Sequence, residues 1–144
     1  ERSDGGQVHY MEYLRNSYKT LKHLIAIPLV STLIIPLLIA DMWIEIYHRI
    51  CFPLYKISCV KRKNYIRIID RGKLKYLTFW QKLYCMYCGY GNGVVNYWTK
   101  IAGETERYWC GIKHQKNNNF VEPENQKDFA EYNDEEGFNK KYKV

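Results

Sequence analysis

The hydrophobic residues of the chain are concentrated in one block. The stretch from Leu24 to Ala40 contains no charged side chain, and apolar residues continue to Ile46, interrupted only by Asp41 and Glu45. At a rise of about 1.5 Å per residue, a helix over this block is long enough to cross a hydrocarbon core of ~30 Å. The pattern therefore predicts one transmembrane helix.

A signal peptide and a buried core helix fit this block less well. A cleavable signal peptide has a short apolar region close to its start and a small-residue cleavage site after it, whereas here 23 mostly polar residues come first. A buried core helix would need other apolar segments around it, and the mean hydropathy of the whole chain is −0.48. Pro28 and Pro36 each remove a backbone donor, so we expect a kinked helix that crosses once, with a segment that dips into one leaflet as the alternative.

Shorter patterns predict the remaining elements. Residues 9–23 have tyrosine and leucine on one side, as in an amphipathic helix at a membrane surface. The alternation in residues 64–70 (NYIRIID) predicts one short strand, and helices are expected over 74–85 and 94–110. Residues 116–144 are polar and poor in aliphatic side chains, so we expect a tail that is flexible or draped over a partner.

Charge follows this organisation. Residues 1–115 carry 17 Lys and Arg against 8 Asp and Glu, a net +9, and residues 116–144 carry 5 against 7, a net −2. Most of the excess lies just after the apolar block, which by the positive-inside rule predicts a cytoplasmic C-terminal part. Cations beside a membrane helix bind anionic head groups, and because no nucleic-acid-binding motif accompanies them we expect no nucleic-acid partner.

The five cysteines suggest the chemistry of the predicted cytoplasmic unit. Structural disulfides are not expected in a reducing compartment, so the cysteines there are buried, redox-active or metal-bound. Cys85 and Cys88 lie three apart and are followed by Gly89, a pattern typical of zinc knuckles. Cys110 and His114 are four apart and complete a Cys3His set, whose thiolate and imidazole ligands favour zinc or iron.

This metal site depends on the backbone reversing direction near Gly103. In an unbroken helix Cys88 and Cys110 would be too far apart for a single ion. Gly103 in a left-handed conformation followed by Thr105 as a cap would end one helix and start the next, bringing the two pairs together. A thiol redox pair at Cys85 and Cys88, or ordinary cysteines without metal, are the alternatives.

A second, weaker metal or proton-relay site is predicted at the end of the apolar block. Asp41, Glu45 and His48 are spaced four and three apart and share one helical face. The alternative is that these groups mark where the helix leaves the lipid, with Asp41 or Glu45 paired to Arg49.

Three segments resemble a known family. YCMYCGYGNG, ETERYWCGIKH and ICFPLY are similar to segments shared by a family of small uncharacterised bacterial membrane proteins, which have CxYCxYxNG and YWCxIKH motifs after an apolar stretch. The resemblance covers most of residues 5–115 and falls on Cys85, Cys88, Cys110 and His114. It implies a bacterial membrane protein with a Cys/His site and no particular reaction.

Together these features predict a mainly α, membrane-anchored protein. We expect a polar lead and amphipathic helix at 1–23, a membrane segment and interface at 24–55, a basic cytoplasmic helical unit with the Cys/His site at 56–115 and a polar tail at 116–144. The expected function is that of an accessory or assembly subunit of a larger complex in the bacterial inner membrane, holding structural zinc, rather than that of an enzyme. The alternative is a membrane-bound redox protein with iron or an iron-sulfur cluster at the same four ligands.

Overall fold

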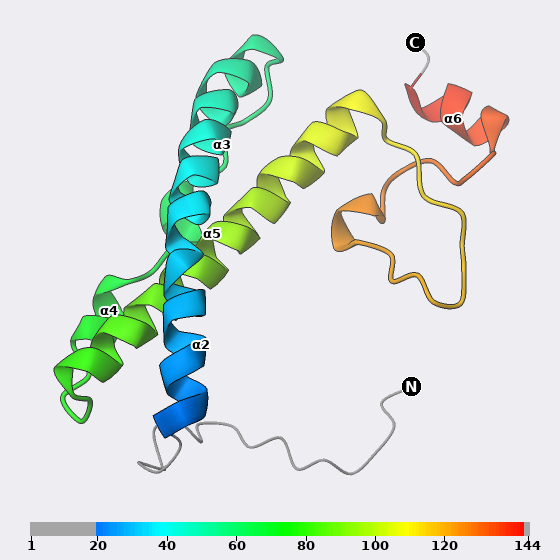
Figure 1. Cartoon of the computed structure of the whole chain (residues 1–144). Coiled ribbons are helices and arrows are strands. Elements are labelled where there is room, and N and C mark those ends of the chain that lie inside the picture. Colours follow the sequence, from blue (N-terminus) through cyan, green and yellow to red (C-terminus); the bar gives the residue numbers. More distant parts are fainter. Residues whose placement is uncertain (1–19, 143–144) are drawn as a thin grey trace.

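The structure, a computed structural model, describes residues 20–142 and is mainly helical (Figure 1). Side chains are described from Leu24 onward, so the amphipathic helix expected over 9–23 lies outside the described residues except for its end. The helices are α2 (Thr20–Thr32), α3 (Ile34–Leu54), η1 (Arg62–Asn64), α4 (Ile69–Gly72), α5 (Phe79–Trp109), η2 (Glu124–Gln126) and α6 (Glu135–Tyr142).

Helices α2 and α3 form one rod over the apolar block. The rod is interrupted only at Leu33, where a turn replaces regular helix. Pro36 explains this position, because its ring has no N–H to donate to the carbonyl four residues earlier. Tyr87 of α5 lies at the same place and donates its hydroxyl to the Val30 carbonyl at 2.5 Å. The sequence prediction of a helix kinked by proline is confirmed here, although Pro28 leaves α2 continuous.

Residues 55–78 connect α3 to α5 without a strand. The strand expected over residues 64–70 is wrong: this stretch contains the end of η1, irregular backbone and the start of α4. The backbone around Tyr65 and Ile66 packs directly on Gly93 of α5 instead of pairing with another strand. In residues 20–142 β-pairing is limited to an isolated parallel bridge between Ile112 and Ala130.

Helix α5 is a single helix of 31 residues, where the sequence predicted two shorter ones. It begins with a capping box, in which the Thr78 hydroxyl accepts from the Gln81 N–H and the Gln81 side chain accepts from the Thr78 N–H. It ends at Trp109, and Gly111, two residues beyond, has a φ of +63°, which suits glycine. Residues 89–93, which lie between the two predicted helices, are helical throughout.

The glycines of α5 are explained by close packing. A Cβ added to Gly93 would lie 2.8 Å from the Tyr65 carbonyl oxygen, closer than real Cβ contacts allow. Gly89, one turn earlier, lies against the Arg67 backbone. Glycine costs about 1 kcal/mol in helix propensity relative to alanine, and here it lets the connecting segment approach the helix axis.

Helix α5 crosses the α2–α3 rod obliquely, with the same general chain direction from its first to its last residue (Figure 1). Tyr87 near its start bonds to Val30 of α2, Tyr97 in its middle bonds to Glu45 of α3, and Tyr108 near its end stacks on Tyr55 at 4.7 Å. After the end of α3 the chain has to return toward the level of α2 before α5 can start and run in the same direction. Residues 55–78 make this return. The small core, formed by Phe52, Tyr97 and Ile101, lies between α3 and α5.

The polar segment after residue 115 packs on the end of α5. Asn125 and Gln126 donate side-chain hydrogen bonds to the Glu106 carboxylate at 2.9 and 2.6 Å, and Phe129 is buried. Lys113 forms ion pairs with Glu122 and Glu131 at 3.2 and 2.7 Å. The expectation of a flexible tail therefore misses these contacts, which rest on polar side chains rather than on aliphatic ones.

Candidate functional site

The structure does not bring the four predicted zinc ligands together. Cys85 and Cys88 lie in the first third of α5, Cys110 follows its last residue, and His114 is beyond the helix with its ring against Phe120. The 22 residues from Cys88 to Cys110 correspond to about 33 Å along a helix. One ion within this chain cannot join the two pairs.

The bend expected at Gly103 is wrong, and the packing of this residue shows why glycine is needed there. Gly103 is buried within α5, and an added Cβ would lie 3.0 Å from the Asn125 side chain. The missing side chain therefore makes room for the segment that folds back on α5 and does not end the helix. Among residues 24–142, no group of three or more His, Cys, Asp or Glu side chains is arranged to hold a metal ion.

Asp41, from the second predicted site, is the centre of a buried polar network. Its side chain lies on the face of α3 that meets α5, and its residue exposure is 6%. Arg62 pairs with both carboxylate oxygens, with Nη1 at 2.8 Å from Oδ1. Tyr90 donates to Oδ2 at 2.9 Å and Trp98 donates to Oδ1 at 3.2 Å. The buried charge is thus neutralised and fully hydrogen-bonded, as buried carboxylates require.

Glu45 and His48 extend this network through Tyr97. The Tyr97 hydroxyl lies 2.8 Å from Glu45 Oε2 and 3.0 Å from His48 Nδ1. The backbone N–H of Val60 donates to His48 Nε2 at 2.9 Å, so this nitrogen carries no proton. His48 is then neutral with its proton on Nδ1, which donates to Tyr97, and Tyr97 donates to Glu45.

The network changes the pKa values of Arg62 and Tyr97, which bond to the carboxylates of α3 from other elements. Hydrogen bonding and charge from Asp41 raise the pKa of Arg62 above its ordinary value. Burial, together with the hydrogen bond to Glu45, raises the pKa of the Tyr97 phenol. Tyr97 therefore stays protonated and Arg62 stays charged, and both act as fixed donors to the two carboxylates of α3.

Asp41, Glu45 and His48 share one face of α3, as the sequence predicted. The pairing of Glu45 with Arg49 is present at 2.7 Å, whereas Asp41 pairs with Arg62 from the connecting segment. The side chains that complete the network come from elements distant in sequence: Arg62, Tyr90, Tyr97 and Trp98. Their helical spacing on α5 was the available signal, since 90, 97 and 98 fall on one side of a helix.

Basic side chains border a cavity beside this network. The cavity has a volume of about 470 Å³ and lies between the end of α3 and the segment before η1. Its lining includes the cations Arg49, Lys61, Arg62 and Lys63 and one acidic side chain, Glu45. Lys61 and Lys63 are exposed, so an anion at the surface of the cavity can reach them.

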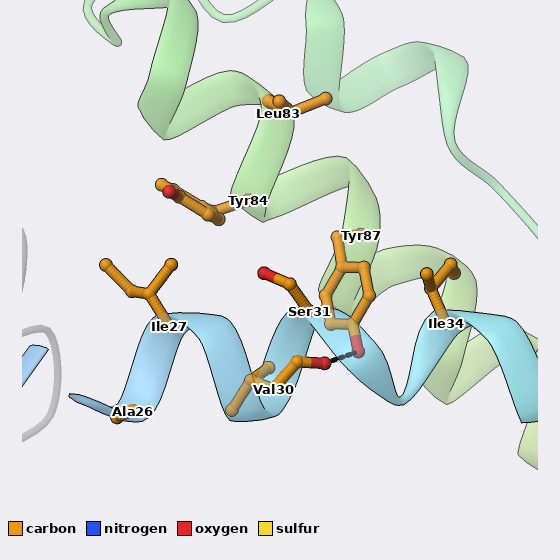
Figure 2. Close-up of a pocket in the computed structure, with 8 residues that line it drawn as sticks. All are labelled: Ala26, Ile27, Val30, Ser31, Ile34, Leu83, Tyr84 and Tyr87. Carbon is orange, nitrogen blue, oxygen red and sulfur yellow. Dashed lines mark hydrogen bonds between the residues drawn. The ribbon is translucent and has the colours of Figure 1, made fainter. Parts of the chain in front are cut away.

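A second cavity is almost entirely apolar. It has a volume of about 430 Å³ and lies between α2 and the first part of α5 (Figure 2). Leu83, Tyr84 and Tyr87 of α5 face α2 and the start of α3 across it, with the Tyr87 hydroxyl bonded to the Val30 carbonyl at its edge (Figure 2). The residues on the other side are Ala26, Ile27, Val30, Ser31 and Ile34.

Large apolar side chains are exposed along the whole α2–α3 rod, and we call this set of residues the apolar stripe. One helix in the described part of the chain, Leu24–Leu54, is long and apolar enough to cross a membrane, and only 6% of its most apolar window is buried. In α3 the exposed side chains lie opposite Asp41 and His48. The stripe consists of Leu24, Ile25, Leu29, Val30, Leu33, Ile35, Leu38, Ile39, Met42, Trp43, Ile46, Ile50 and Leu54, each at least 42% exposed.

No protein-family model, curated protein or solved structure matches this chain. The resemblance to small bacterial membrane proteins therefore stays an expectation, and the geometry of the rod, the polar network and the two cavities is the basis for a function.

Proposed function

We propose that the chain is a membrane-bound accessory protein. Its apolar stripe inserts among lipid acyl chains, its basic cavity contacts anionic head groups, and its folded-back tail faces the partner subunits of a larger membrane complex. The observation that carries the proposal is the stripe, because thirteen large apolar side chains from one rod are exposed while Asp41 and His48 of the same rod are buried.

This arrangement is the reverse of a helix in a water-soluble domain. Soluble amphipathic helices turn apolar residues to the core and polar residues to water. In α3 the buried residues are Asp41, His48 and Phe52, and the exposed residues other than Arg49 are apolar. Intramembrane polar groups face the protein interior in the same way.

The size of the stripe supports a lipid partner. Soluble monomers rarely expose apolar patches larger than a few hundred Å², and larger ones mark protein or membrane contacts. Tyr55 and Trp109 lie at the end of the rod, where aromatic side chains are enriched at the lipid–water interface. Lys61 and Lys63 border the basic cavity beside Glu45 and His48, and each cation near an anionic surface contributes about 1 kcal/mol.

Vesicle co-sedimentation tests the proposal. The full chain is expected to sediment with vesicles of phosphatidylcholine and to bind several-fold more tightly when phosphatidylglycerol is added. Leu38→Glu places a charge in the middle of the stripe and should reduce binding to both vesicle types by at least tenfold, because a charge in hydrocarbon costs about 2.5–3.5 kcal/mol.

The matched control is Val121→Glu, which puts the same charge on an exposed apolar residue outside the stripe. It should bind like the unmodified chain. The double variant Lys61→Gln/Lys63→Gln should lose only the additional binding to phosphatidylglycerol. A chain that stays in solution with both vesicle types, or equal losses from Leu38→Glu and Val121→Glu, would contradict the proposal.

A further inference from the structure

We infer that the α2–α3 rod lies along one leaflet of the bilayer and does not cross it, so that the bilayer contacts only one side of the molecule. The inference rests on the proposed membrane binding and specifies the surface that the lipid occupies. The helix that runs beside the rod and the charged segment that connects the two helices support it.

Helix α5 reaches both ends of the rod through its side chains, although the two helices cross obliquely (Figure 1). Contacts to α5 begin at Val30, continue through Leu37 and Asp41, and reach Tyr55. If the rod crossed the hydrocarbon core, α5 would cross it alongside. Because the two helices run in the same direction, residues 55–78 would then have to pass back through the bilayer between them.

The connecting segment cannot make that passage in lipid. It lies at the depth of the middle of the rod, since Arg62 reaches Asp41 and the Arg67 carbonyl packs near Gly89 of α5. Arg67 and Arg71 are exposed there. An arginine at the centre of a membrane helix costs about 2.5–3.5 kcal/mol. Irregular backbone also leaves N–H and C=O groups that hydrocarbon cannot satisfy.

A tangential position removes this conflict. Ile39 and Met42 of the stripe lie on the side of α3 away from Asp41, where Arg62 docks. With the stripe turned to the acyl chains, α5 and the connecting segment lie on the water side, and cations at the flank reach the head groups. Interfacial helices of this kind bury their apolar face by about 5–10 Å.

The first test is the side of the membrane on which the two ends of the chain lie. An epitope tag is added before residue 1 and another after residue 144, and sealed membrane vesicles from cells that produce the chain are treated with protease from one side. Both tags are expected to be cut from the same side. If the rod and α5 both crossed the bilayer, the connecting segment would cross it as well, and three passages would put the two ends on opposite sides. Protection of one tag while the other is cut would therefore overturn the inference.

The second test measures depth, because a loop that dips deeply and returns would also leave both ends on one side. Ile35→Trp introduces an indole at an exposed position in the middle of the rod. Its added fluorescence should be quenched most by lipids brominated close to the head group, whereas strongest quenching by bromine at the chain ends would overturn the inference.

Val121→Trp serves as the control, because its added fluorescence should be quenched by neither lipid. Failure of the chain to sediment with vesicles would instead remove the proposed function itself, so the two failures are distinguishable.

Discussion

The two faces of α3 show opposite uses of the same helix. The inner face contains Asp41 and His48, which are 6% and 3% exposed, and both side chains bond to partners on other elements. The outer face contains residues such as Ile39 and Met42, which are more than half exposed. The inner face therefore determines how the chain folds, and the outer face is available to bind lipid.

The largest effect is expected when the inner face loses its cation. Arg62→Met leaves the Asp41 carboxylate buried without its counter-charge, and removing one partner of a buried pair costs about 3–5 kcal/mol. The free energy of unfolding, measured in detergent micelles with urea, should fall by about this amount. Arg49→Met is the control, since the Arg49 side chain is 73% exposed and its pair with Glu45 is a surface pair. Equal losses from the two variants would show that Asp41 does not depend on Arg62.

A smaller effect is expected where the connecting segment packs on α5. Gly93→Ala puts a Cβ 2.8 Å from the Tyr65 carbonyl oxygen, which is backbone and cannot rotate away. Overpacking of this kind costs about 1–3 kcal/mol. Gly91→Ala has only an ordinary 3.9 Å contact with the Leu37 side chain, so its helix propensity should leave stability unchanged or slightly higher. The same urea measurement compares them, and a neutral Gly93→Ala would contradict the packing.

The smallest effect on stability is expected on the outer face. Ile39→Gln changes a side chain that is 52% exposed and should alter the free energy of unfolding by no more than about 0.5 kcal/mol. The same substitution should weaken vesicle binding severalfold, because an amide replaces aliphatic surface in contact with lipid. A large loss of stability with unchanged vesicle binding would mean that the outer face is packed within the protein and does not bind lipid.

The sequence predicted the apolar helix, its break near proline and the shared face of Asp41, Glu45 and His48. Each depends on residues close together in the chain, where period and spacing are informative. The glycines of α5 were misread because a glycine that ends a helix and a glycine that accepts another segment look alike in sequence. Gly93 and Gly103 are distinguished only by what lies against them, Tyr65 and Asn125, which are 28 and 22 residues away.

The two pairs of predicted zinc ligands are separated for the same reason. The spacings of Cys85 with Cys88 and of Cys110 with His114 are local, but the distance between the two pairs depends on whether the chain turns at Gly103. The predicted pairing with Arg49 is present for Glu45 on the same helix, whereas Arg62, the partner of Asp41, comes from the returning segment and was missed. Sequence reasoning found the members of each cluster that share an element and missed those that come from another.

The single interruption of the rod at Leu33 has a mechanical consequence. Beyond it, α2 is held to the remainder by the Tyr87 hydroxyl and by contacts across the apolar cavity, whereas α3 is fixed by a charged pair and an aromatic core. The first helix is therefore held to the rest of the fold by fewer polar and aromatic contacts than the second. On a curved lipid surface, the α2 end would adjust its position at a smaller cost in internal contacts than the α3 end.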